Sequence, residues 1–533
     1  MNCSTTQVPY TATGYFSKLI TAYLENEPGL RSFYAHRPDK NGIQAAIKAR
    51  QQFTQDHRQL LVSALQEQYA GATPSGAVQR NIELLKEPTT FTITTAHQPA
   101  IFTGHLYFIY KILHTIRLAE QFRKEWPDYN FVPVFWMGSE DADLDELGHI
   151  WLSGDTLTWD TKQKGAVGRM NTKGLEKIIH RIEGELSIHP HGPALVQLLK
   201  ESYLNSPDIQ TATFRLLHAL FAEYGLVVII PDRADLKRAM QPVFEDDLFR
   251  QQPSVIVQQT VEALSARYKV QANPRPINLF YLTDGIRELI EKDQDQYAVR
   301  NTSIRFSPEQ LQAELNAHPE RFSPNVILRG LYQETILPNI AFVGGGGETA
   351  YWLELKEFFH HYQVPFPVLV LRNSFLVMEK KWEEKMEKLG FSVPDIFRSE
   401  QQLLSLLVSR QSNGHLKLEK ELQAASTLYE ELAQKAGQID NTLLPHIEAL
   451  RSRTVKPLQE LEKKMLRAEK RKYDNEQVQI RLLRSALFPK NGLQERVANF
   501  LPFYAQWGAA FIRELYKASL GLEQEFVVLH VED

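Results

Sequence analysis

The sequence predicts an α/β protein, in which a parallel β-sheet core is followed by a long α-helical region. Between about Phe91 and Phe375, short β-rich runs alternate with helical segments, as in proteins with a parallel sheet. Runs such as LVVII are continuously apolar, which is typical of strands buried on both faces. After Phe375 the chain becomes charged and helical. Because the chain has 533 residues, we expect two or three units.

The first 88 or so residues are predicted to be helical. The stretches YFSKLITAYLEN and IQAAIKARQQFTQDHRQLLVSALQEQYA carry apolar residues at three- and four-residue spacing, and the turn-forming loop GATPSG follows them. We therefore assign these helices to the N-terminal part of the core.

Six short runs are the strand candidates of the core: TFTITTA, FVPVFWM, LVVIIP, INLFYL, NIAFV and FPVLVLR. The mixed stretches at about 151–217 and 237–324 are predicted to be insertions into this core. Together with the N-terminal helices, these elements define a predicted first domain at 1–375.

The region 376–533 is predicted to be a helical coiled-coil domain whose C-terminal segment packs on the core. Its apolar residues step by four and three, with one stutter, through Leu418, Leu422, Ala425, Tyr429, Leu432, Ala436, Ile439, Leu443, Ile447, Leu450, Thr454, Leu458, Leu461, Met465 and Ala468. Pro445 and Pro457 interrupt the pattern, which indicates either one kinked helix or two helices paired with each other. We expect the heptad pattern to mediate a homodimer; the alternative is an amphipathic helix that lies on its own domain.

The composition of the chain argues against a nucleic-acid-binding, membrane-spanning or secreted protein. The net charge of −4 gives no overall attraction to nucleic acid, and no apolar run is long enough to cross a membrane. Cys3 is the only cysteine, which excludes an intrachain disulfide framework and a cysteine-based zinc site. The N-terminal residues lack the features of a signal peptide, so we expect a cytoplasmic protein.

The stretch TTAHQPAIFTGHLYFIYK is predicted to belong to one βαβ unit. A strand at 91–96, a loop at 97–104 and a helix at 106–122 lead to the next strand at 131–137. The loop at the carboxyl end of such a strand faces a ligand crevice, where helix amides favour anions. We expect the loop and the helix start to bind a substrate or nucleotide through His97, Gln98, Thr103, Gly104, His105, Tyr107 and Lys111. The alternative is that His105 only caps the helix and His97 is a buried structural histidine.

A second strand-to-helix loop follows NIAFV, where four glycines, Gly344, Gly345, Gly346 and Gly347, precede Glu348. Glycines allow the backbone to approach a ligand closely. However, the carboxylate at the helix start occupies the position that a phosphate would take, so an ammonium group or hydroxyls suit this loop better. The alternative is that Glu348 only stabilises its helix.

The third stretch, FWMGSEDADLDELGH, places five carboxylates directly after a strand. Hard cations prefer carboxylate oxygens, but the spacing fits no standard calcium loop, and we predict no metal site. A helix start capped by Ser139 would explain most of the acidic residues. We expect Asp141, with Glu140 beside it, to hold a substrate amine or hydroxyl.

These motifs, together with FSPNVILRGLYQETILPNIAFVGGGGETAYWLELK and LFPKNGLQERVANFLPFY, resemble the cysteine-adding enzymes of bacillithiol biosynthesis over nearly the whole chain. The resemblance implies a Rossmann-like core with connecting insertions, similar to class I aminoacyl-tRNA synthetases, and a coiled coil that dimerises. It also implies a cysteine ligase that joins L-cysteine to glucosaminyl-malate. The chain departs from the family pattern at His105, Ala142 and Gly330, and any role of a histidine at position 142 is in doubt here.

The resemblance implies that ATP activates the cysteine carboxylate as an adenylate, which the glucosamine amine then attacks. His97, His105 and Asp141 are the predicted catalytic residues. The histidines would offset charge on phosphates, Asp141 and Glu348 would hold amines, and Arg329, near Asn325, would pair with a carboxylate. The sequence contains no strict HIGH or KMSKS signature, so ATP rests on the resemblance alone.

Two other functions stay open at this stage. A tRNA-related, synthetase-like protein is suggested by the core and by the basic run at 463–472, although a solvated helix face explains that run more simply. A non-catalytic coiled-coil scaffold would leave the two glycine-bearing loops unexplained.

Overall fold

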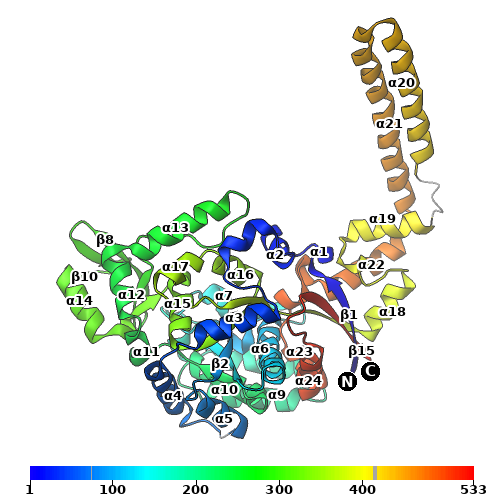
Figure 1. The fold of residues 1–533 in the computed structure, drawn as a ribbon. Helices are drawn as coiled ribbons and strands as arrows, with labels where there is room; N and C mark the ends of the chain where they lie inside the picture. The colour runs from blue at the N-terminus through cyan, green and yellow to red at the C-terminus, as the bar shows by residue number, and fades with distance from the viewer. Residues whose placement is uncertain (74, 412–416, 533) are drawn as a thin grey trace. The chain divides into compact units, whose positions relative to one another are not determined.

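A computed structural model describes residues 1–73, 75–411 and 417–532, which divide into two units (Figure 1). The larger unit comprises Met1–Thr11, Tyr15–Leu376 and the residues from Leu493 onward, and the smaller comprises Ala12–Gly14 and Val377–Gly492. The C-terminal residues therefore return to the unit that contains the N-terminus.

Five parallel strands form the central sheet of the larger unit, in the order β13-β12-β2-β3-β6. They are β2 (Thr90–His97), β3 (Asn130–Met137), β6 (Val227–Ile229), β12 (Asn339–Gly344) and β13 (Val368–Leu371). Five of the six predicted runs supply these strands, so the predicted parallel sheet is confirmed. The carboxyl ends of neighbouring strands consequently meet at one edge.

One face of this sheet packs on α3 (Lys40–Arg50) and α6 (Tyr107–Glu125). Phe91 and Ile93 of β2 point into this apolar core, while the Thr residues between them point to the other face. The alternating Thr/Phe/Thr/Ile pattern therefore fits a strand that is covered on both sides. The long α6 connects β2 to β3, which completes the predicted βαβ unit.

The N-terminal region differs from the prediction in two ways. The long helix expected after α2 (Lys18–Leu24) is divided into α3 and α4 (Gln55–Tyr69), because Thr54 ends the extended link and accepts a hydrogen bond from the His57 amide at 3.3 Å. The helix α5 (Gly76–Leu84) follows. Asn2–Pro9 forms a strand, β1, that pairs antiparallel with β15 (Glu525–Glu532) near the other end of the chain. Neither strand was predicted, since each depends on a partner far away in the sequence.

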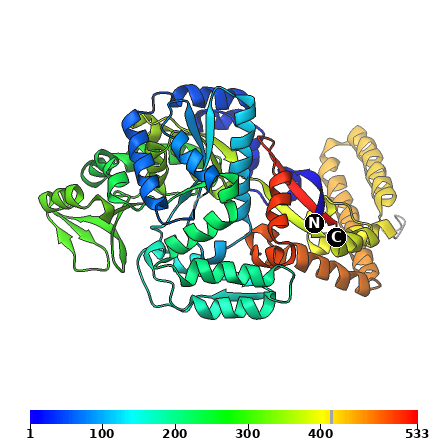
Figure 2. The same ribbon diagram turned by 90° about the horizontal axis from the view of Figure 1, so that it is seen from below.

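The two predicted insertions contain different structures. The first holds the hairpin of β4 (His149–Leu152) and β5 (Asp155–Thr158), then the helices α8 (Leu175–Leu186), α9 (Gly192–Leu199) and α10 (Ile209–Phe221). The second contains an antiparallel sheet in the order β10-β9-β8-β7-β11, which lies away from β1 and β15 in both views (Figures 1 and 2).

The run INLFYL forms β7 (Leu279–Thr283) of this antiparallel sheet, so it is a strand but does not belong to the parallel core. Its neighbours are β8 (Ile286–Asp293), β9 (Gln296–Val299), β10 (Arg305–Phe306) and β11 (Phe322–Pro324). The helices around it are α11 (Ala234–Arg238), α12 (Gln241–Glu245), α13 (Gln252–Ser265) and α14 (Pro308–Ala317). After β11 the chain returns to the core through α15 (Val326–Ile336), and α16 (Gly346–Trp352) and α17 (Lys356–His361) follow β12.

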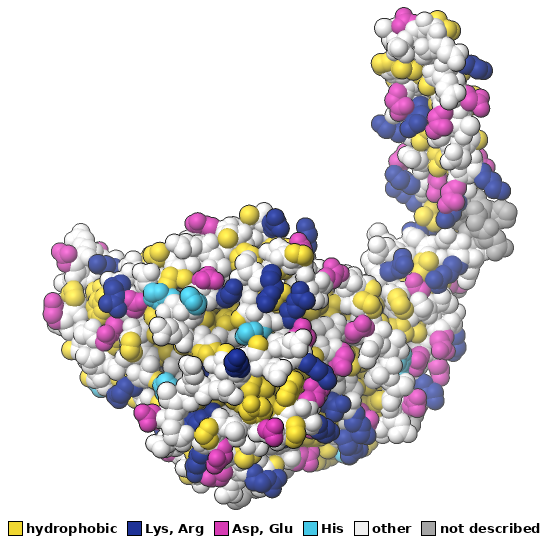
Figure 3. All heavy atoms as spheres, viewed as in Figure 1, with side chains coloured by type: hydrophobic (Ala, Val, Ile, Leu, Met, Phe, Trp, Pro, Cys, Tyr) yellow, Lys and Arg dark blue, Asp and Glu magenta, His cyan; other side chains and the backbone are white. Residues whose placement is uncertain are grey.

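The smaller unit is helical, with α18 (Lys380–Lys388), α19 (Glu400–Gln411), α20 (Glu419–Ile439), α21 (Leu444–Lys470) and α22 (Asp474–Leu487). The heptad region is the antiparallel pair of α20 and α21, in which the Tyr429 and Thr454 hydroxyls hydrogen-bond at 2.7 Å. Of the two predicted alternatives, the paired helices are therefore correct. Apolar side chains remain exposed along this hairpin (Figure 3), among them Leu428, Ile439 and Leu461.

Among the described helices, none is both long and apolar enough to span a membrane.

Candidate active site at the carboxyl ends of the strands

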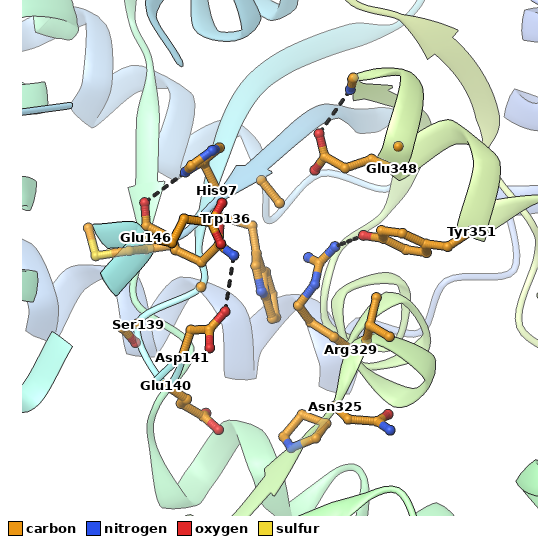
Figure 4. A pocket seen from close by; sticks show the side chains of 18 of the residues that line it. His97, Trp136, Ser139, Glu140, Asp141, Glu146, Asn325, Arg329, Glu348 and Tyr351 are labelled. Atoms are coloured by element: carbon orange, nitrogen blue, oxygen red, sulfur yellow. Dashed lines mark hydrogen bonds between the residues drawn. The ribbon is translucent and has the colours of Figure 1, made fainter. Parts of the chain in front are cut away.

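A cavity of about 580 Å³ opens where four parallel strands end (Figure 4). His97 at the end of β2, Gly138 after β3, Gly345 after β12 and Arg372 after β13 all line it. The predicted residues that line it are His97, Gln98, Tyr107, Glu140, Asp141, Asn325, Arg329, Gly345, Gly346, Gly347 and Glu348. The structure thus brings the three predicted loops together at one sheet edge, as the topology of a parallel sheet requires.

His97 is held in a neutral form. Its Nδ1 lies 2.9 Å from the Gln98 carbonyl oxygen, so Nδ1 carries the proton. Its Nε2 lies 3.2 Å from the Tyr107 hydroxyl and accepts that hydrogen bond. Burial, together with the nearby charge of Lys111, lowers the pKa of His97 to about 4. At neutral pH the imidazole is therefore uncharged, and its single acceptor nitrogen is used by the Tyr107 hydroxyl.

Glu348 forms an ion pair with Lys111, whose side chain is only 1% exposed. The Lys111 Nζ lies 2.5 Å from Oε2 of Glu348 and also donates to the Ala96 carbonyl, and the Gly345 amide donates to the same Oε2 at 2.9 Å. Burial alone would raise the pKa of Glu348, but Lys111 and the amide hold it below its usual value. Since both contacts use Oε2, Oε1 is free for a ligand.

The acidic stretch after β3 supplies two carboxylates with different surroundings. Asp141 accepts hydrogen bonds from the Gln98 side chain at 3.0 Å and from the Ala142 amide at 2.8 Å, and Arg287 lies 3.7 Å from it. Glu140 pairs through Oε1 with the buried Lys237 at 2.9 Å, whereas its Oε2 is buried without a partner.

The helix in this stretch does not start where we expected. It is α7 (Leu144–Leu147), and Asp143 caps it by accepting from the Glu146 amide at 3.0 Å. The Ser139 hydroxyl forms no hydrogen bond, so the predicted Ser139 cap is wrong. Within the described ranges, no three His, Cys, Asp or Glu side chains are grouped as metal ligands.

Arg329 is a partly buried cation on the opposite wall (Figure 4). One guanidinium nitrogen, Nη2, donates to the Tyr351 hydroxyl, and the other, Nη1, is buried without a partner. Asn325 caps α15 by accepting from the Ile327 amide at 2.9 Å, so it fixes the helix that carries Arg329.

Five predicted residues do not line the cavity: Thr103, Gly104, His105, Lys111 and Gly344. The Nδ1 of His105 hydrogen-bonds to the Val497 carbonyl at 3.3 Å, and Gly104 adopts a φ of +60°, so both shape the loop before α6. Lys111 acts on the cavity through its ion pair with Glu348 and through its charge near His97.

The sequence analysis missed several cavity residues, among them three arginines and Tyr351. Arg372 directly follows a predicted strand at the same edge, so the logic applied to the other loops would have found it. Arg287, Arg496 and Tyr351 also line the cavity, but no local pattern indicates them, because they come from β8, the C-terminal segment and the far end of a short helix.

A polar cavity with groups of both charges, at the carboxyl edge of a parallel sheet flanked by helices, defines a Rossmann-type α/β enzyme core. Residues 1–373 match the family model described as "Bacillithiol biosynthesis BshC, N-terminal Rossmann-like domain", and residues 375–531 match the model of its C-terminal coiled-coil domain. The chain therefore belongs to the BshC family of bacillithiol biosynthesis. The predicted family and the predicted combination of a Rossmann-like core with a coiled coil are confirmed.

Curated relatives extend over almost the whole chain. The relative from Flavobacterium johnsoniae is 39% identical and the one from Cytophaga hutchinsonii 38%, covering 98% and 94% of this chain and 99% and 94% of those proteins. A relative from Salinibacter ruber is 30% identical over 96% of both chains. All three are named "Putative cysteine ligase BshC".

Proposed function

We propose that this protein joins L-cysteine to glucosaminyl-malate through an amide bond, the step that forms bacillithiol. The observation that carries the proposal is Arg329, whose buried Nη1 has no partner among the described residues, in a cavity that also holds the carboxylates of Asp141 and Glu348. Both substrates carry carboxylates together with an amine, so they need groups of both charges. The family membership and the names of the relatives support the same reaction.

In this proposal Arg329 pairs with a substrate carboxylate, since a guanidinium matches a carboxylate with two parallel donors. Asp141 and the free Oε1 of Glu348 hold ammonium or hydroxyl groups. His97, as a neutral acceptor, holds the Tyr107 hydroxyl, whose oxygen can accept from the substrate amine or thiol. These residues act by positioning the two substrates and by stabilising charge.

Amide formation joins the amine nitrogen to the cysteine carbonyl carbon; one carboxylate oxygen would leave bound to the phosphate of the activating nucleotide, and the ammonium group loses two protons. ATP would supply the activation that removes this oxygen in water. The glycine loop fits a phosphate poorly, because Glu348 already occupies the Gly345 amide. The Arg496 side chain fits phosphate better, and it is the residue that would hold a nucleotide here, while Arg329 pairs with the substrate carboxylate.

The direct test incubates the purified full chain with L-cysteine, glucosaminyl-malate and ATP and detects bacillithiol by mass spectrometry. Arg329→Met and Asp141→Asn should each lower kcat/KM by tenfold or more, as expected for a lost charged hydrogen bond. His97→Ala should lower the rate by about 10²-fold if its hydrogen bond acts as charge develops. Arg513→Met, which changes an exposed arginine that does not line the cavity, is the matched control.

A second test places the reaction in the cell. Deleting the gene should cause glucosaminyl-malate to accumulate and bacillithiol to disappear. Normal bacillithiol in a clean deletion would show that another protein adds the cysteine, and the proposed function would then be wrong.

A further inference from the structure

The segment Leu493–Asn499 lies within the motif LFPKNGLQERVANFLPFY. Of the residues in this motif, the proposed function uses only Arg496, which would bind a phosphate. The segment belongs to the larger unit and reaches two strand ends of the active site. We call it the C-terminal brace. Its Glu495 is fully buried and binds Arg372 through two hydrogen bonds, of 3.0 Å and 2.7 Å.

The brace also holds the loop between β2 and α6. Asn499 donates through Nδ2 to the Phe102 carbonyl at 3.0 Å and to the Gly104 carbonyl, and the Leu106 amide donates to the Ala498 carbonyl at 2.8 Å. Phe102 adopts a positive φ of 49°, which is uncommon for a residue with a side chain. The brace therefore fixes the loop that positions Tyr107.

Arg496 lies between these two anchors and lines the cavity. Within the described residues its guanidinium forms no hydrogen bond or ion pair, although its neighbours on both sides are firmly attached. Its side chain is exposed, so it lies at the open side of the cavity. Partial desolvation and the nearby charge of Arg372 lower its pKa.

The two arginines on this wall, Arg372 and Arg496, differ in whether a carboxylate neutralises them. Glu495 neutralises Arg372 with ideal two-pronged geometry, but no described carboxylate pairs with Arg496. A cation that is fixed at a cavity by its backbone, yet has no partner in the protein, is suited to an anion supplied by a ligand.

We propose that Arg496 binds an anionic oxygen group of the ligand, a carboxylate or a phosphate, on the wall formed by Tyr107 and Arg372. Glu495 is the positioning residue, because it compensates Arg372 and leaves Arg496 as the free cation. The identity of the ligand that supplies this anion rests on the proposed function, whereas the anion subsite itself does not.

The test is a calorimetric titration of the full chain, its Arg496→Met and Arg496→Gln variants and the Arg513→Met control. The ligands are inorganic phosphate, ATP, L-malate, glucosaminyl-malate and glucosamine. Both Arg496 variants should bind either the phosphate ligands (inorganic phosphate and ATP) or the carboxylate ligands (L-malate and glucosaminyl-malate) about tenfold more weakly than the wild type does. This is the effect expected for one charged hydrogen bond. The affinity of the Arg496 variants for glucosamine, which lacks a carboxylate, should equal that of the wild type. The Arg513→Met variant should bind all the ligands as the wild type does.

The ligands whose affinity falls in the Arg496 variants identify the source of the anion. Loss confined to phosphate and ATP assigns the subsite to a nucleotide, and loss confined to L-malate and glucosaminyl-malate assigns it to the substrate carboxylates. If the wild type binds none of the anions, or if both variants bind all of them as the wild type does, the inference is overturned. Weakened anion binding without bacillithiol formation would preserve the subsite and refute the proposed function.

Discussion

Arg372 and Glu495 face each other through two parallel hydrogen bonds, and their side chains are 3% and 0% exposed. Arg372 follows a strand of the parallel sheet, whereas Glu495 lies 123 residues later, beyond the whole helical hairpin. Glu495 also accepts a hydrogen bond from the Phe375 amide at 3.2 Å. This pair therefore connects the active-site wall to the C-terminal part of the chain.

Replacing Glu495 by Ala should leave a buried arginine without its counter-charge. Breaking such a pair typically costs about 3–5 kcal/mol, so urea denaturation should show a loss of this size. The control is Glu67→Ala, which removes the carboxylate of an exposed pair with Arg233 and should cost less than about 1 kcal/mol. Equal losses in the two variants would show that the buried pair does not stabilise the fold.

Glu348→Gln should lower both the stability of the fold and the affinity for the ligand, and a double variant can separate the two effects. Ligand binding should weaken because the substitution removes the charge of the carboxylate, and the fold should be destabilised because Lys111 loses the group that balances its buried charge. We expect a loss of about 3 kcal/mol in the free energy of unfolding. The double variant Lys111→Met with Glu348→Gln should recover stability but not ligand affinity. Recovery of both in the double variant would contradict a direct role of Glu348 in binding.

His114 should make stability fall as the pH is lowered. It is fully buried, donates to the Gly521 carbonyl at 2.8 Å and accepts from the Asn373 amide at 3.0 Å. Burial lowers its pKa to about 4, below the value of about 6.5 in an unfolded chain, so its contribution is present above pH 6.5 and is lost as the pH falls towards 4.

The variant His114→Gln lacks this dependence, so its destabilisation relative to the wild type should be about 2 kcal/mol smaller at pH 5 than at pH 7. Denaturant unfolding at pH 5 and pH 7 measures the difference in the free energy of unfolding between the variant and the wild type. This difference should be the same at pH 7 and pH 8, which serves as the internal control. A difference that grows towards pH 5 would show that His114 is protonated in the folded protein.

The helical hairpin is predicted to mediate a homodimer. In α20 only Ala436 is buried and in α21 no residue is, so the heptad positions are incompletely covered within one chain. Replacing residues 420–466 by a short Gly/Ser linker should yield a folded monomer in light scattering. Ile439→Glu should weaken the dimer, whereas Ile188→Glu, at an equally exposed position of the larger unit, should not. A dimeric deletion variant would place the main interface elsewhere.

A cut between Phe375 and Leu418, at the start of the heptad pattern, would be the obvious way to remove the hairpin, but it is unsuitable. It would also remove the C-terminal brace and β15, which belong to the larger unit. The internal deletion avoids this problem.

The sequence predicted those parts of the site that depend on local pattern. His97, Asp141 and Glu348 each follow a recognisable strand, and the ends of parallel strands converge, so their meeting in one cavity could be inferred. Arg496 could not be found in this way, because its position depends on Glu495 and Asn499 binding groups more than 100 residues away. The role of His105 was also undetermined, since its partner, the Val497 carbonyl, lies 392 residues away.

The pairing of β1 with β15 has a consequence for how the protein is made. Thr6 and His530, which hydrogen-bond at 3.0 Å, are 524 residues apart, so a ribosome must add more than 500 residues after β1 before this strand gains its partner. Until then the exposed edge of β1 is open to pairing with other nascent chains. A product that stops before residue 495 would therefore lack both the partner strand of β1 and the carboxylate that neutralises Arg372.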